Sequence, residues 1–199
     1  MALMRPLVGN QITIFVEGQE ILTLQDILPA TLGIRVLFVG KTPAPDSVEA
    51  GHYFQGKQGA TFWSILKKRG LLAPTTEFED DSLLGHGYGL TDIVKVPHAF
   101  GVEPSDQEYM DGSSRILKLI RIHLPKLVVF VYKKVLDKII RLQFNIEKKS
   151  IYGFNHSLRA HFGARVFAFP LPGVGRCSAA EATSAIQELV IACKREGAT

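Results

Sequence analysis

The stretch IRVLFVGKTPAPDSVEAGHYF, residues 34–54, gives the strongest indication of the fold. It opens with six mainly apolar residues, several of them β-branched, and such a run is typical of a strand buried in a sheet. The run stops at Gly40, and Pro43 and Pro45 follow closely, so we expect a tight loop directly after the strand. Because open α/β sheets bind ligands at the carboxyl ends of their strands, this loop is the candidate site.

The loop allows three interpretations. The tripeptide GKT at residues 40–42 matches the end of a phosphate-binding loop, but that motif requires a glycine five positions upstream of its last glycine, where this chain has Arg35. Pro43 also disfavours helical conformation at the residue before it. These two departures argue against nucleotide binding. An ordinary surface loop is the second interpretation.

The third interpretation rests on a spaced pattern. GKTPA at residues 40–44 is followed after six residues by GHYF at residues 51–54, and later by Phe62 and Trp63. This pattern resembles the first active-site motif of the uracil-DNA glycosylase superfamily, closest to its mismatch-specific uracil/thymine-DNA glycosylase branch. Those proteins show a strand, then G-I-N-P-G, six residues, an aromatic-containing G-H-H-Y, and F-W. Thr42 stands where that family has an asparagine.

Other segments agree with the same family in the same order along the chain. LTLQDIL at residues 22–28 resembles its lead-in, and GYGLTD at residues 87–92 resembles its G-x-G-x-T-N segment. PKLVVF at residues 125–130 resembles the strand before its G-K turn, here VYK at residues 131–133. FPLPGVGRC at residues 169–177 resembles its second active-site motif. Agreement of several motifs in order is a far stronger signal than any one of them.

Strands and helices alternate along most of the chain, which predicts an α/β fold. With the resemblance, this implies a three-layer sandwich in which helices flank a mostly parallel central sheet, plus an N-terminal β-hairpin. We expect residues 1–199 to form a single domain, of which residues 1–20 are a tail and hairpin. We expect strands near residues 11–16, 34–39, 127–131 and 165–169, and helices near residues 24–28, 61–69, 105–122, 134–141 and 178–194.

The composition is ordinary for one globular domain, with 199 residues of which 46% are hydrophobic and 21% charged. No apolar run reaches the ~20 residues of a membrane span, and residues 1–6 lack the features of a secretion signal. We therefore expect a cytoplasmic, nucleoid-associated monomer. Cys177 and Cys193 are too few for a disulfide framework or a four-thiolate cluster, so we expect no metal and no cofactor.

Charge is unevenly distributed along the chain. Residues 126–165 carry nine basic and two acidic side chains, whereas residues 74–111 carry nine acidic side chains and one basic side chain, Lys95. A chain polarised in this way can present one basic face to the phosphates of DNA. Each of these lysines could equally belong to a solvated helix face.

The resemblance implies hydrolysis of the bond between a pyrimidine and deoxyribose, which needs a positioned water and a surface that holds the flipped base. Thr42 replaces the asparagine that positions the water. Asp92 matches a position that reads the base edge, and its carboxylate could act as a general base; a helix N-cap is the alternative. Phe54 matches the aromatic that stacks on the base, with a core phenylalanine as the alternative. The catalytic candidates are Thr42, Asp92 and Asp46, and the base-binding candidates are Lys41, Ser47, Tyr53 and Phe54.

The second motif resembles the loop that enters the minor groove of DNA. Arg176 matches the arginine that thymine-DNA glycosylases insert into the space left by the flipped nucleotide. Leu171 stands where relatives have a polar residue. A solvent-exposed loop without contact to DNA is the alternative. The DNA-binding candidates are Leu171, Pro172, Gly173, Val174, Arg176 and Lys133.

These expectations favour a monofunctional DNA glycosylase that flips uracil from double-stranded DNA and hydrolyses its N-glycosidic bond. Its partner would be double-stranded DNA containing uracil or a mismatch. Two alternatives stay open. The departures at Thr42 and Leu171 could mean that catalysis has been lost and that the protein only recognises damaged DNA. The enzyme could also act on another base, such as hypoxanthine or thymine opposite guanine.

Overall fold

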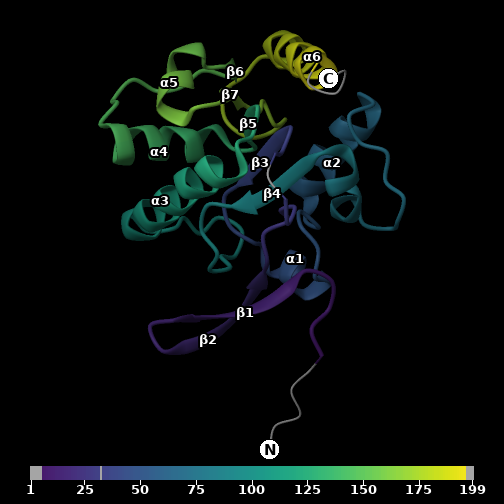
Figure 1. The fold of residues 1–199 in the computed structure, drawn as a ribbon, viewed down its shortest axis with the longest axis vertical. Helices are drawn as coiled ribbons and strands as arrows, with labels where there is room; N and C mark the ends of the chain where they lie inside the picture. Colours follow the sequence, from purple (N-terminus) through teal and green to yellow (C-terminus); the bar gives the residue numbers. More distant parts are fainter. Residues whose placement is uncertain (1–5, 32, 196–199) are drawn as a thin grey trace, which may run out of the picture.

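A five-stranded sheet forms the centre of the protein (Figure 1). The computed structural model describes residues 6–31 and 33–195. Four strands are parallel, and the edge strand β6 is antiparallel to its neighbour. The sheet has the order β4 (Tyr88–Asp92), β3 (Val36–Gly40), β5 (Leu127–Phe130), β7 (Arg165–Ala168) and β6 (Gly153–Phe154).

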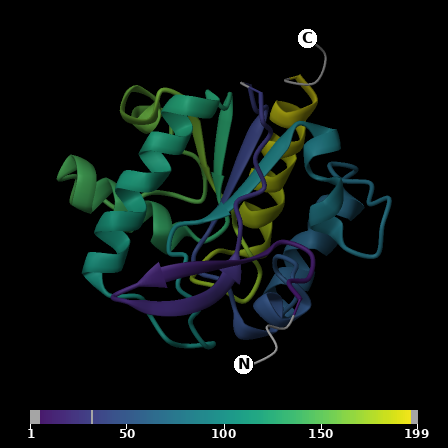
Figure 2. The same ribbon diagram turned by 60° about the horizontal axis from the view of Figure 1, so that its bottom comes forward.

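Helices cover both faces of this sheet, as Figure 2 shows. The helices α2 (Lys57–Lys68) and α6 (Ala179–Arg195) pack on one face, and α3 (Asp106–His123) and α4 (Lys133–Phe144) pack on the other. Alternate residues of each strand therefore enter two different cores, which explains why β3 is apolar throughout. The predicted three-layer α/β sandwich is confirmed.

The N-terminal hairpin is confirmed as a separate two-stranded unit, β1 (Gln11–Val16) and β2 (Gln19–Leu24). Glu17 and Gly18 both have positive φ, 50° and 79°, which is the geometry of a two-residue turn that matches the twist of the strands. The hairpin base is bonded to the helix α1 (Pro45–Ala50), because Gln11 donates from Nε2 to the carbonyl of Val48 at 2.6 Å.

Two of the predicted helices, α3 and α6, begin with capping boxes. Ser105 accepts a hydrogen bond from the backbone N–H of Glu108 at 3.2 Å, and the Glu108 carboxylate accepts one from the backbone N–H of Ser105 at 2.8 Å. Ser178 and Glu181 make the same reciprocal pair before α6. Such boxes pair backbone N–H groups that a helix start otherwise leaves free, so they locate helix ends well from sequence.

Two local predictions were wrong. Residues 24–28 form no helix, because Ile27 makes a two-way backbone bridge to Leu90 at the edge of β4 and Pro29 leaves no room for a further turn. The loop after β3 contains α1, which starts at a proline in the first helical position.

Residues 1–5, where we expected no secretion signal, lie outside the described residues. Among the helices of residues 6–31 and 33–195, none is long and apolar enough to cross a membrane. The short helices are η1 (Glu79–Ser82), η2 (Leu84–His86), η3 (His156–Leu158) and α5 (Arg159–Phe162).

Candidate active site at the carboxyl ends of β3 and β4

The candidate site lies where the chain reverses its direction across the sheet. From β3 the chain first moves to β4 on one side, and then crosses back to β5 on the other side. The loops that follow β3 and β5 therefore diverge, which is where open α/β sheets leave a crevice for ligands. Gly40 and Asp92 are paired in register at the ends of their strands, so both lie at this edge.

Asp92 is the most unusual residue at this edge. It is 1% exposed, and among the described residues neither carboxylate oxygen has a hydrogen-bond partner. Burial raises the pKa of Asp92 to about 7; Asp26 adds to the rise, whereas Lys95 and Arg115 oppose it. A buried carboxylate without partners costs free energy and is uncommon outside functional sites. Asp92 ends a strand, so the alternative of a helix N-cap is wrong.

Gly40 and Phe54 complete a tight group with Asp92. A Cβ atom on Gly40 would lie 2.0 Å from Oδ1 of Asp92 and 3.0 Å from Cζ of the Phe54 ring, so the carboxylate occupies the space that a side chain would need. Phe54 has a φ of 58°, a strained conformation for a bulky residue. Its ring is half-buried and packs against Phe62 and Trp63, with centroids 5.3 and 5.6 Å away.

A charged network that sequence analysis missed supports the end of β4. Asp26 binds Nζ of Lys95 at 2.9 Å and Nη1 of Arg115 at 2.6 Å, and it accepts from the Thr91 hydroxyl at 2.6 Å. Burial alone would raise the pKa of Asp26, but Lys95 and Arg115 outweigh burial and hold it below its ordinary value. Arg115 also donates to the backbone carbonyl of Asp92. In the sequence, only Lys95, the single basic residue in an acidic segment, indicated that such a charged network exists.

Two other candidates near β3, Thr42 and Ser47, have structural contacts. Thr42 is half-buried and donates its hydroxyl proton to the carbonyl of Val96 at 2.5 Å. Ser47 is buried, and its hydroxyl accepts from the backbone N–H of Gln55 at 3.0 Å. Asp46 is exposed in the first turn of α1. These contacts hold the loop and α1 against neighbouring segments.

Tyr53 and Lys41 differ in their access to a ligand. Tyr53 is 1% exposed, and its hydroxyl donates to the carbonyl of Gln25 at 2.9 Å and accepts from Lys95 at 3.0 Å. The prediction that Tyr53 contacts the base is therefore corrected: its side chain belongs to the core. Lys41 is partly exposed and forms an ion pair with Glu103 at 3.3 Å.

The second motif emerges at the same edge, because it follows β7, which runs parallel to β3 and β5. Pro172, Gly173 and Arg176 are exposed, and Val174 is half-buried. Leu171 is 3% exposed and packs in the apolar core, which corrects its assignment as a DNA contact. Lys133, the first residue of α4, binds Asp137 one helical turn later at 2.8 Å.

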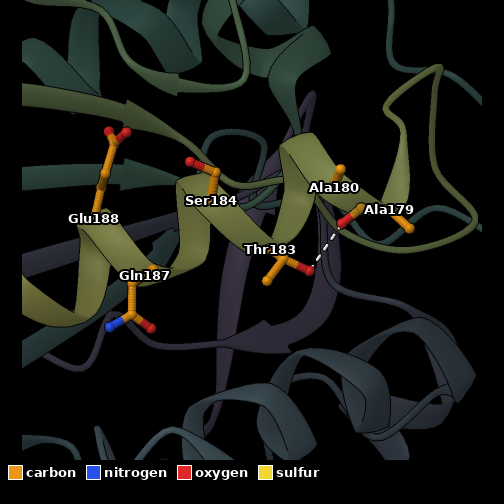
Figure 3. A pocket seen from close by; sticks show the side chains of 6 residues that line it. All are labelled: Ala179, Ala180, Thr183, Ser184, Gln187 and Glu188. Carbon is orange, nitrogen blue, oxygen red and sulfur yellow. Dashed lines mark hydrogen bonds between the residues drawn. The ribbon is translucent and has the colours of Figure 1, made fainter.

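A hollow of about 680 Å³ lies on the outer surface of α6, away from the predicted residues. Its lining side chains come from successive turns of this one helix (Figure 3). They are Ala179, Ala180, Thr183, Ser184, Gln187 and Glu188. Among the described residues only those of α6 line the hollow, so we assign it no function.

Comparison with known proteins agrees with this geometry. The family model described as the uracil DNA glycosylase superfamily matches residues 30–178, well over half of the chain. A G/U mismatch-specific uracil DNA glycosylase of Schizosaccharomyces pombe is 29% identical over 101 residues, which cover 49% of this chain. The matched part spans 31% of the length of that relative. The chain thus belongs to the uracil DNA glycosylase superfamily.

Proposed function

We propose that this protein is a monofunctional DNA glycosylase that flips uracil out of double-stranded DNA and hydrolyses its N-glycosidic bond. The observation that carries this proposal is the buried, unpartnered carboxylate of Asp92 beside Gly40 and the Phe54 ring. Membership of the superfamily supports glycosylase chemistry, and the relative named for G/U mismatches supports uracil as the base. The protein would act as a monomer wherever genomic DNA is held.

The chemistry assigned to Asp92 follows from the charge of the transition state. Loss of the base leaves positive charge on the sugar, and a nearby carboxylate stabilises that charge and accepts a proton from the attacking water. A pKa near neutrality suits a group that must take up a proton during the reaction. Thr42 donates its own proton to Val96, so its oxygen stays free to accept a hydrogen bond from that water.

The direct test is a labelled duplex with one G·U pair, incubated with the protein and then treated with alkali. A break at the uracil is expected. A duplex that is bound but stays intact would instead favour a protein that recognises damage without catalysis. Parallel duplexes carrying hypoxanthine, or thymine opposite guanine, identify the base if uracil is not the preferred one.

Phe54→Ala is expected to slow uracil excision about tenfold or more, because base–aromatic stacking contributes about 1–3 kcal/mol per base. Affinity for undamaged duplex should change little, since no base is flipped there. Single-turnover excision and fluorescence anisotropy measure the two effects. Phe54→Tyr keeps a ring and should retain most of the rate; equal rates for the alanine and wild-type proteins would contradict stacking.

Arg176→Ala is expected to slow excision from duplex DNA severalfold while sparing single-stranded DNA, because only a duplex leaves a gap for a side chain to fill. Arg176 is exposed, so its removal should leave folding intact. The matched control is Arg159→Ala, an exposed arginine in α5, which precedes β7 at the opposite edge of the sheet. Equal losses on both kinds of DNA would argue against insertion.

A further inference from the structure

An exposed aromatic side chain stands at a corner of the loop between β4 and α3. Phe100 is 88% exposed, and its neighbour Val102 is also exposed. The backbone N–H of Val102 donates to the carbonyl of Ala99 at 3.1 Å, and Gly101 has a φ of 85°. These features define a β-turn with Phe100 at its second position and glycine at the third, where positive φ is required.

The loop that carries this turn is fixed at both ends. On one side, the backbone N–H of His98 donates to the carbonyl of Pro43 at 3.2 Å, and the His98 ring pairs with Glu108 at 2.9 Å. On the other side, Glu103 accepts from the Tyr109 hydroxyl at 2.6 Å. A rigid turn that displays a large apolar ring loses little conformational freedom when the ring is covered, which favours binding.

The turn lies at the sheet edge that holds the candidate site. Its loop follows β4, and the Arg176 loop follows β7, with β3 and β5 between them. Neighbouring strands lie about 4.8 Å apart, so three steps across the sheet separate these loops by roughly 14 Å. Base pairs repeat every ~3.4 Å along a duplex, so this separation corresponds to about four base pairs.

We propose that the turn at residues 99–102 is a second DNA-contacting element, in which Phe100 packs against the duplex a few base pairs to one side of the flipped nucleotide. The inference rests on the proposed function, since it takes damaged duplex as the substrate. Apolar side chains that enter the minor groove pack between base steps, and Phe is one of the residues used. Residues 99–102 carry no charge, and the next residue, Glu103, pairs with Lys41 at 3.3 Å and with Lys134 at 3.1 Å. Phosphates that approach the turn therefore meet two lysines around one carboxylate.

The test measures binding without cleavage. The full chain and its Phe100→Ala variant are titrated by fluorescence anisotropy with a duplex containing one 2′-fluoro-deoxyuridine, which resists excision. The variant should bind about fivefold more weakly or worse, on the scale of one lost aromatic contact. The matched control is Leu124→Ala, because Leu124 is also exposed but precedes β5 at the opposite edge; its affinity should equal that of the wild type.

A second measurement locates the contact. The fluorescent base 2-aminopurine is placed at each of three positions on either side of the lesion analogue. Compared with the wild type, Phe100→Ala should change the 2-aminopurine emission on one side of the lesion analogue only. Phe100→Trp, which keeps an aromatic ring, should show the wild-type pattern. Unchanged affinity and emission for Phe100→Ala would overturn the inference. A shift from dimer to monomer in Phe100→Ala would overturn it too, because the turn would then bind a second copy of the chain.

The outcomes separate this inference from the proposed function. If the wild type excises uracil and Phe100→Ala binds normally, the turn is not a DNA contact and the enzyme proposal stands. If the wild type excises no uracil but Phe100→Ala loses duplex affinity, the contact stands and the uracil assignment fails. A wild type that does not bind the duplex at all would refute both.

Discussion

Asp92→Asn is expected to lower the single-turnover rate of uracil excision by about a hundredfold or more. General-base catalysis contributes on the order of 10²–10⁴ in rate, and asparagine keeps the shape of the side chain without its proton affinity. Affinity for the lesion duplex should stay close to that of the wild type. Asp111→Asn, which changes an exposed carboxylate on α3, is the matched control and should keep full activity.

The pH dependence of the rate gives the same prediction a second readout. A general base must be ionised, so the wild-type rate should rise as the pH passes through about 7, the pKa to which burial raises Asp92. The residual rate of Asp92→Asn should lack this rise. Full activity in Asp92→Asn together with loss of activity in Asp46→Asn would transfer the role to the exposed carboxylate of α1.

The same substitution is expected to stabilise the protein. The pKa of Asp92 rises from its ordinary value of 3.8 to about 7 on folding, because burial disfavours the charge. The folded state therefore holds a proton that the unfolded state releases between these values, so stability falls as the pH rises from about 4 to 7. Three pKa units correspond to about 4 kcal/mol, an upper bound for the cost at alkaline pH.

Urea unfolding of the wild type and Asp92→Asn measures this gain. At pH 8 the variant should be more stable by about 2 kcal/mol, less than the bound because the buried amide also lacks partners. The gap should shrink as the pH falls below about 7 and be reversed below about pH 3, where the wild-type carboxyl is protonated in both states. Other titrating groups occur in both proteins and cancel in the difference. A variant that is less stable than the wild type at pH 8 would mean that the carboxylate has binding partners in solution.

The layered fold follows from patterns that lie within short segments. The apolar run ending at Gly40 marks β3, and the capping boxes at Ser105 and Ser178 mark the starts of α3 and α6. Residues 24–28 were misassigned because their conformation depends on Leu90, a partner far along the chain. Local spacing carries no information about such a partner.

The site could be predicted only in part, because local sequence patterns do not reveal contacts between distant segments. A motif gives the order of residues but not the direction of each side chain, so Tyr53 and Phe54 were both assigned to the base, although Tyr53 lies in the core. Leu171 was misassigned in the same way. The pairing of Asp26 with Arg115 joins residues 89 positions apart, and nothing in either neighbourhood of the sequence indicates it.

Asp26 also sets a lower limit on how far the protein can be shortened. The family match begins at residue 30, so a truncation at that boundary would discard the only carboxylate that binds both Lys95 and Arg115 among the described residues. Two cations would then remain behind the end of β4 without their counter-ion, and the strand would lose its bridge to Ile27. The segment ahead of the residues that match the superfamily model thus stabilises the end of β4 in this protein.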